Sequence, residues 1–323
     1  MSTIETYHIP ALLKETIDLM AIDPEGTYID VTFGGGGHSR AILSKLGRNG
    51  RLFGFDRDID AYANVPDDPR FTFVHGDFRY ITNFLEYYGV EKVNGILADL
   101  GVSFHHFDSP ERGFSFRTEG PLDMRMNKEG LVTAKSIINS KTENEIRDIL
   151  RNHTDLRNSG AIARAINIAR RNKEIDTTSL LADIVKPHLN PKNLKKELAQ
   201  VFQALRIETN DEMTALEKLL SSSLKILKPE GRIAILTYHS GEDRMVKDFF
   251  KTGAFNPKPD SEMLIYGKTK SPWKILTPTP ITAGEEEVSA NPRSRSAKLR
   301  VAELIDANTK PSKNKTKDSV IKK

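Results

Sequence analysis

Short hydrophobic runs, each ending at an acidic or small residue, recur in the N-terminal part of this chain. They occupy residues 28–33, 51–55, 71–74 and 93–98, and the segments between them have a more polar, helix-like pattern. A fifth run at 232–238 and a last one at the end of 291–304 follow much later. Strands that alternate with helices predict an α/β fold with a mostly parallel, doubly wound sheet. The last strand is expected to pair antiparallel at one edge.

A long insertion separates the fourth and fifth predicted strands, since about 130 residues lie between them and an ordinary crossover needs far fewer. Within it, Thr142 and Glu145 form a capping-box pattern ahead of Ile146, and apolar residues repeat at helical spacing over 162–169. We therefore divide the chain into a first part of the core (1–108), an inserted helical domain (109–205), a second part of the core (206–305) and a disordered basic tail (306–323).

Composition narrows the function classes. The chain has 323 residues, 38% of them hydrophobic, which suffices for a substantial core. It has no cysteine, which excludes disulfides, thiolate metal sites and cysteine nucleophiles. The net charge of +4 resides in residues 306–323, which hold six lysines and two aspartates and read either as a solubilising end or as an RNA-contacting arm. No apolar run reaches the roughly 20 residues of a membrane span and no signal-peptide pattern is present, so a cytoplasmic protein is expected.

A run of four glycines, at positions 34–37, follows the first predicted strand and precedes a helix. Glycine lets the backbone turn sharply and approach a ligand closely. Asp56 ends the second strand about 20 residues further on, the spacing at which an acidic side chain meets a ribose in dinucleotide-binding folds. Ser39 stands where the nicotinamide fingerprint has its third glycine, and no P-loop motif is present. The pattern of Asp30, the glycines and Asp56 is instead similar to the S-adenosylmethionine loop of class I methyltransferases.

From Asp99 onward the resemblance becomes specific. The blocks TFGGGGHSRAIL, ADLGVSFHHFDSPERGFSFRTEGPLDMRMN, FQALRIETNDEM, YHSGEDRMVK and NPRSRSAKLRVAE resemble, in the same order, the bacterial MraW/RsmH family of 16S rRNA (cytosine-N4)-methyltransferases. The resemblance implies a class I, Rossmann-like methyltransferase core interrupted by a helical substrate-recognition domain. It also implies that S-adenosylmethionine is the methyl donor and that the substrate is a decoding-centre cytidine of 16S rRNA in the small subunit. No metal is expected, because His105 and His106 point apart on any regular backbone and no predicted helix offers paired histidine ligands.

On the matching positions, the resemblance implies a set of donor-binding residues: Gly36, Gly37, His38, Asp56, Phe78, Asp99 and His106. In this set Asp56 is the ribose ligand and Phe78 lies beside the adenine. The family commonly has Ser-Pro-Gln where this chain has Phe104, His105 and His106, so the side-chain contact at position 106 is either made by an imidazole or lost.

The loop after the fourth strand is the predicted catalytic element. A cytosine N4 amine is a poor nucleophile because its lone pair is delocalised into the ring, and acceptors for its hydrogens localise that pair during attack. Asp99 and Ser103 are the catalytic candidates, since ligands sit beyond the carboxyl ends of parallel strands. Asp99 is expected to orient the donor or N4 without acting as a full general base. A mixture of cations and aromatic residues is predicted to contact the RNA: Arg112, Phe114, Phe116, Arg117, Arg125, Arg293 and Arg295.

Two other functions stay open at this point. A non-catalytic RNA-binding ribosome-assembly factor would keep the same fold, although the intact glycines, Asp56 and Asp99 argue against a decayed site. A methyltransferase acting on adenine N6 would carry an Asn/Asp-Pro-Pro-aromatic loop, and this chain has Asp-Leu-Gly-Val at positions 99–102.

Overall fold

The structure is a computed structural model that describes residues 10–102, 109–255 and 271–306. Within these ranges the strands form one sheet in the order β3-β2-β1-β4-β5-β8-β6, and β7 pairs with β8. The strands are β1 Thr27–Asp30, β2 Arg51–Asp56, β3 Phe71–His75, β4 Val93–Asp99, β5 Leu227–Thr237, β6 Trp273–Ile275, β7 Ile281–Thr282 and β8 Lys298–Leu304.

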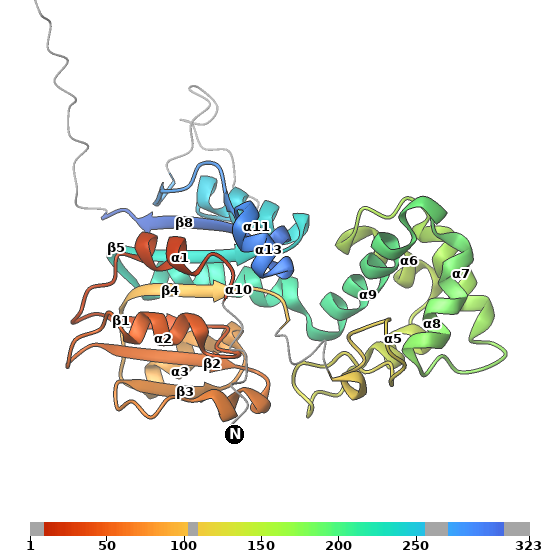
Figure 1. The fold of residues 1–323 in the computed structure, drawn as a ribbon, viewed down its shortest axis with the longest axis horizontal. Coiled ribbons are helices and arrows are strands. Elements are labelled where there is room, and N and C mark those ends of the chain that lie inside the picture. The colour runs from red at the N-terminus through yellow and green to blue at the C-terminus, as the bar shows by residue number, and fades with distance from the viewer. Residues whose placement is uncertain (1–9, 103–108, 256–270, 307–323) are drawn as a thin grey trace, which may run out of the picture.

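Strands β1 to β5 are parallel, and β8 runs antiparallel to β5 (Figure 1). This arrangement confirms the predicted α/β sheet with an antiparallel edge and the class I methyltransferase fold. Parallel pairing places the carboxyl ends of β1, β2 and β4 along one edge of the sheet, so Asp30, Asp56 and Asp99 end neighbouring strands.

Helices cover both faces of the sheet, which explains why the strands are almost continuously hydrophobic. The core helices are α1 Leu13–Met20, α2 Gly37–Leu43, α3 Ile81–Tyr87, α10 Glu212–Ile226, α11 Ser240–Thr252 and α13 Glu285–Ala290. Short 3-10 helices are η1 Ile59–Asn64, η2 Phe78–Tyr80, η3 Pro110–Arg112, η4 Lys186–His188, η5 Pro191–Asn193 and η6 Pro292–Ser296. None of the helices in the described ranges combines the length and apolarity that a membrane crossing requires.

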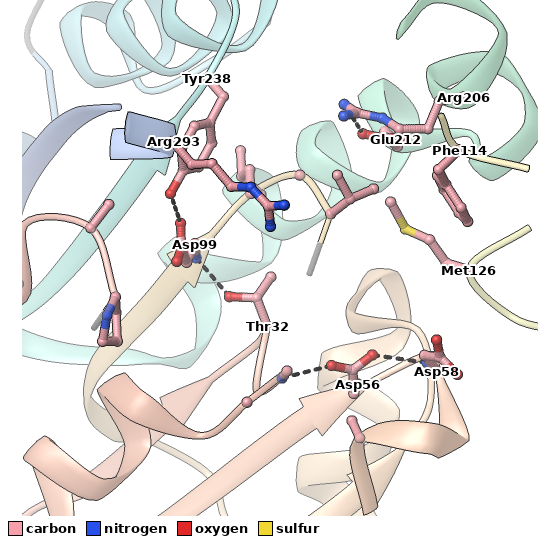
Figure 2. Close-up of a pocket in the computed structure, with 18 of the residues that line it drawn as sticks. Thr32, Asp56, Asp58, Asp99, Phe114, Met126, Arg206, Glu212, Tyr238 and Arg293 are labelled. Carbon is pink, nitrogen blue, oxygen red and sulfur yellow. Dashed lines mark hydrogen bonds and ion pairs between the residues drawn. The ribbon is translucent and has the colours of Figure 1, made fainter. Parts of the chain in front are cut away.

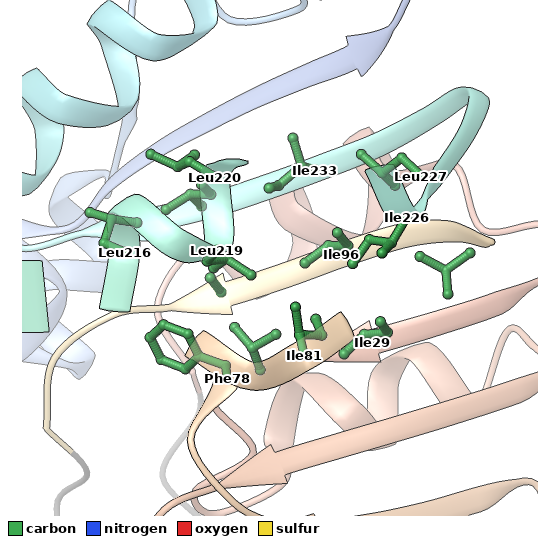
Figure 3. Close-up of a cluster of buried hydrophobic side chains, with 14 of the residues drawn as sticks. Ile29, Phe78, Ile81, Ile96, Leu216, Leu219, Leu220, Ile226, Leu227 and Ile233 are labelled. Atoms are coloured by element: carbon green, nitrogen blue, oxygen red, sulfur yellow. The ribbon is translucent and has the colours of Figure 1, made fainter. Parts of the chain in front are cut away.

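Alternation along each strand divides the core of the sheet between its two faces. Ile96 and Ile233 belong to the cluster beneath α3, α10 and α11, whereas the next residues, Leu97 and Ala234, belong to the cluster beneath α1 and α2. Figure 3 shows Leu219 of α10 packed over the first of these faces. Complete burial of one such aliphatic side chain contributes roughly 1.5–3 kcal/mol, so α10 is firmly attached to the sheet.

The insertion between β4 and β5 has a hydrophobic core of its own, drawn from residues 114–205. Its helices are α5 Ala134–Ser140, α6 Glu143–His153, α7 Ser159–Ala169, α8 Thr178–Val185 and α9 Leu194–Asn210. The capping box of Thr142 and Glu145 is present at the start of α6, as the sequence predicts. Helix α9 is followed directly by α10. Asp211 separates the two helices, and its left-handed backbone conformation, with φ of 50°, ends the first one. Figure 1 shows this helical unit beside the carboxyl edge of the sheet.

Three local predictions differ from the structure. Strand β5 begins at Leu227, before the predicted run at 232–238, and its first part contains an irregularity with Glu230 at φ 64° and a register shift against β4. Strand β6 is not among the predicted strands, and its Trp273 is buried against Phe250. Helix α5 is absent from the sequence prediction, because it is only seven residues long.

Candidate functional site

A cavity of about 2220 Å³ lies at the carboxyl edge of the sheet, between the core and the inserted helices. Pockets that hold one drug-sized ligand are about 300–1,000 Å³, so this one has room for two ligands. Its sheet side includes six of the residues predicted from the sequence: Gly36, Gly37, His38, Asp56, Phe78 and Asp99. Ser103 and His106, the other two, lie outside the described residues. Figure 2 shows the Asp56 and Asp99 carboxylates on strands of the sheet, with Phe114 and Met126 of the insertion across the cavity.

The glycine loop requires glycine at specific positions. Gly34 and Gly36 have φ values of 49° and 72°, in the left-handed region that side chains disfavour. A Cβ on Gly36 would also lie 2.9 Å from the Phe33 ring, whereas a Cβ on Gly35 would meet nothing within 4 Å. A Cβ on Gly37 would lie 2.3 Å from Pro10, so this glycine is needed for packing. The loop therefore leaves open space at Gly35 on the cavity wall.

Asp56 is held in a fixed orientation beside this loop. One carboxylate oxygen accepts the Gly34 N–H at 2.8 Å and the other accepts the Asp58 N–H at 2.8 Å (Figure 2). Each carboxylate oxygen has a second lone pair, so a carboxylate fixed in this way is suited to receive the two hydroxyls of a ribose. Phe78, 9% exposed, lines the same part of the cavity and lies under the Arg57 guanidinium, 5.6 Å from its ring centre.

Beneath the loop, Asp30 and His38 are buried. Asp30 accepts the Ser39 hydroxyl at 2.7 Å and the Thr32 N–H at 3.1 Å, and burial raises the pKa of its carboxyl group. Burial lowers the pKa of His38, which favours the neutral imidazole. The His38 Nδ1 lies 3.7 Å from an Asp99 oxygen. This buried side chain therefore packs against the catalytic candidate and exposes little of its own surface to the cavity.

Asp99 has the geometry expected of a reactive carboxylate. Its Oδ1 accepts the Tyr238 hydroxyl at 2.6 Å, and its backbone N–H donates to the Thr32 hydroxyl at 2.6 Å (Figure 2). Although 24% of its side chain is exposed to the cavity, burial raises the pKa of Asp99 to about 7. Burial, and then the Asp99 charge, raise the pKa of Tyr238 well above its usual range, so the phenol stays protonated and donates.

Tyr238 is a site residue that the sequence prediction missed. It stands directly after β5, which pairs with β4, and so its hydroxyl meets a carboxylate 139 positions away in the chain. The signal that would have found it is the block that begins YHSGED, which matches the family and whose first residue is Tyr238. In that block, Glu242 accepts the Tyr238 N–H at 2.8 Å and pairs with His239 at 3.2 Å.

The far side of the cavity combines apolar side chains with a partly buried ion pair. Phe116 and Phe202 meet edge to face with ring centres 5.5 Å apart, and both line the cavity. Arg206 of α9 donates twice to the carboxylate of Glu212 on α10, at 2.8 and 2.9 Å. Both ends of this fork lie in the block FQALRIETNDEM, for which the sequence prediction gave no role.

The predicted RNA-contacting residues differ in their exposure. Arg112 is 5% exposed and pairs with the buried Asp58, so its assignment to an RNA surface is wrong. Phe114 packs in the inserted core but lines the cavity, as Phe202 and Met126 do, so its contact with RNA stays a prediction. Arg125 is held by Asp123 at 2.7 Å. The exposed members that line the cavity are Arg117, Arg293 and Arg295.

Most of the chain resembles known rRNA methyltransferases. Residues 5–305 match the MraW methylase family. The chain is 52% identical over 298 residues to the ribosomal RNA small subunit methyltransferase H of Bacteroides fragilis, with 92% of this chain and 97% of that protein covered. It is 49% identical over 302 residues to the protein of the same name from Porphyromonas gingivalis, with 93% and 97% covered. Among solved structures, a putative rRNA methylase from Clostridium thermocellum superposes with a TM-score of 0.42 at 15% identity, covering 92% of this chain and all of that one.

Proposed function

Because the chain belongs to the MraW methylase family, we propose that it transfers a methyl group from S-adenosylmethionine to N4 of a decoding-centre cytidine in 16S rRNA. The enzyme acts in the cytoplasm, where small ribosomal subunits are made. The observation that carries this proposal is the lining of the cavity. The glycine loop and Asp56 line one side, aromatic side chains of the insertion line the other, and Asp99 lines the same cavity.

The residues on the sheet side fit the methyl donor. The open space at Gly35 admits a ligand against the backbone, Asp56 receives the ribose hydroxyls, and Phe78 offers an apolar surface to the adenine. S-adenosylmethionine supplies a methyl group that the positive sulfur already activates. His106, which lies outside the described residues, remains a predicted further contact.

Asp99 is the proposed acceptor for the cytosine amine. With Oδ1 occupied by Tyr238, the carboxylate is fixed so that it can accept a hydrogen bond from N4, which localises the nitrogen lone pair. Because its pKa is about 7, about half of the Asp99 carboxyl groups are ionised near neutral pH, and the ionised form is the one that accepts the N4–H. Ser103, outside the described residues, is proposed as a second acceptor in the same loop.

We assign substrate recognition to the inserted helical domain, which comprises residues 109–205. A cytidine within folded RNA must leave its stack to reach the cavity, and aromatic side chains are suited to receive it. Phe116, Phe202 and Met126 supply that surface, and Arg293 and Arg295 at the cavity rim supply cations for flanking phosphates.

The test uses labelled S-adenosylmethionine and small subunits from cells that lack the enzyme. Label mapped to N4 of one cytidine of 16S rRNA is the expected result, and it should disappear with Asp99→Asn. Donor binding without transfer to any subunit or RNA preparation would contradict the proposal and favour an assembly factor.

A further inference from the structure

Arg112 occupies an unusual position for a cation that the sequence places in an RNA-binding loop. Its guanidinium, 6% exposed, lies 2.9 Å from Asp58 and 3.1 Å from Asp60 of the core. It also donates to the backbone carbonyls of Arg125 and Met126, at 2.9 and 3.0 Å, within the inserted segment. One side chain therefore connects the insertion to the turn that follows β2.

That turn forms one side of the proposed donor site. The Asp58 N–H donates to Asp56 at 2.8 Å, so the ribose ligand is oriented by the same residue that Arg112 holds. At the other end of η1, the Asn64 amide donates to the Gly34 carbonyl at 3.0 Å. Helix η1 is thus attached to the insertion at its start and to the glycine loop at its end.

We propose that Arg112 is a positioning residue for the methyl donor: by holding Asp58 and Asp60, it fixes η1 and through it the Asp56 carboxylate. The inference rests on the proposed function in so far as Asp56 binds the ribose of S-adenosylmethionine. It also means that the packing of the inserted domain against the core is coupled to the affinity for the donor, because the same guanidinium contributes to both.

Loss of the Arg112 side chain is expected to change the position of η1 while the overall fold is kept. Without the guanidinium, the buried Asp58 carboxylate loses its ion pair with Arg112, and the start of η1 loses that attachment to the insertion. The junction between insertion and core keeps other contacts: Asn210 donates to the Met124 carbonyl and accepts the Met126 N–H, both at 2.8 Å, and Arg57 donates to the Asn210 carbonyl at 2.8 Å.

The test measures binding of S-adenosylmethionine to the full-length protein by calorimetry, without RNA. We expect Arg112→Met to weaken binding by about tenfold or more, as for loss of a charge-assisted contact. Lys128→Met is the matched control, because Lys128 lies 2.6 Å from the same Asp60 carboxylate but is 50% exposed, and it should change binding by less than about twofold. Arg112→Lys keeps the positive charge but lacks the several N–H donors of the guanidinium, so its affinity for the donor should lie between those of Arg112→Met and the wild type.

A cycle with Asp56→Ala separates positioning from general damage. If Arg112 acts through Asp56, the double variant binds about as weakly as Asp56→Ala alone. The inference would be overturned if Arg112→Met bound S-adenosylmethionine as tightly as the wild type. It would also be overturned if the fold-losses in affinity of Arg112→Met and Asp56→Ala multiplied in the double variant. Should Arg112→Met not fold, Asp60→Asn replaces it in this test. Asp60→Asn weakens the same attachment and leaves no buried charge unpaired, because Arg112 keeps its ion pair with Asp58 and Lys128 is 50% exposed. Unchanged affinity in Asp60→Asn has the same meaning. A wild-type protein that binds no S-adenosylmethionine would instead overturn the proposed function, and with it this inference.

Discussion

Removing the Tyr238 hydroxyl should move the pH dependence of methyl transfer. If the ionised Asp99 carboxylate is the form that accepts N4–H, the rate rises with pH through the Asp99 pKa of about 7. The Tyr238 hydrogen bond lowers that pKa, because it stabilises the charged form. Tyr238→Phe therefore raises the pKa of Asp99 and shifts the rise in rate to higher pH.

The size of the shift follows from the geometry. A hydrogen bond to a charged group contributes about 1.5–3 kcal/mol, and one pKa unit is 1.36 kcal/mol. Asp99 is 24% exposed to the cavity, so we take the lower end, about one unit. The ionised fraction at pH 7 then falls from about one half to about one tenth, and the rate falls about fivefold. By about pH 9 the variant should recover most of its activity.

The assay is single-turnover methyl transfer to small subunits with saturating donor, measured from about pH 6 to pH 9. Asp99→Asn serves as the reference, because it should lose both the activity and the titration. A uniform loss of rate in Tyr238→Phe, with the midpoint still near that of the wild type, would refute the reasoning and leave Tyr238 as a packing residue.

Three further variants test the loop, the RNA surface and the core. Gly36→Ala forces a side chain to φ 72° and should lower the free energy of unfolding by about 1–3 kcal/mol in urea, whereas Gly35→Ala, which meets no atom, should leave it nearly unchanged. If Arg293 and Arg295 contact RNA phosphates, reversing both to glutamate should reduce the slope of log affinity against log salt by about 1.4 in magnitude; an unchanged slope removes them from the interface. Leu219→Ala, at a fully buried position, should cost about 2–5 kcal/mol in urea unfolding without altering the midpoint of the pH profile.

The parts of the fold that local pattern specifies were predicted correctly. Strands β1, β2 and β4 are largely buried and so appear as uninterrupted apolar runs, and their carboxyl ends must meet at one edge. This is why Asp56 and Asp99 were predicted from the sequence and lie on one cavity in the structure. By contrast β6 has only three residues, which is too short for a recognisable period.

The remaining site residues depend on tertiary contacts that no local pattern contains. Arg112 next to Phe114 has the composition of a nucleic-acid surface, and only the approach of Asp58 and Asp60 from another part of the chain makes it a buried ion-pair residue. Tyr238 likewise meets Asp99 only because β5 pairs with β4 across the insertion. Chemistry that arises between distant segments is therefore the part that sequence reasoning missed.

The placement of the insertion also has a consequence during synthesis on the ribosome. Strand β4 ends at Asp99, and its partner β5 begins at Leu227, so at 5–20 residues per second roughly 6 to 26 s pass between their appearances. In that interval the inserted helices, which have their own hydrophobic core, can pack while one edge of β4 has no partner strand. An unpaired apolar strand is prone to aggregate, so the nascent chain is most vulnerable midway through its translation.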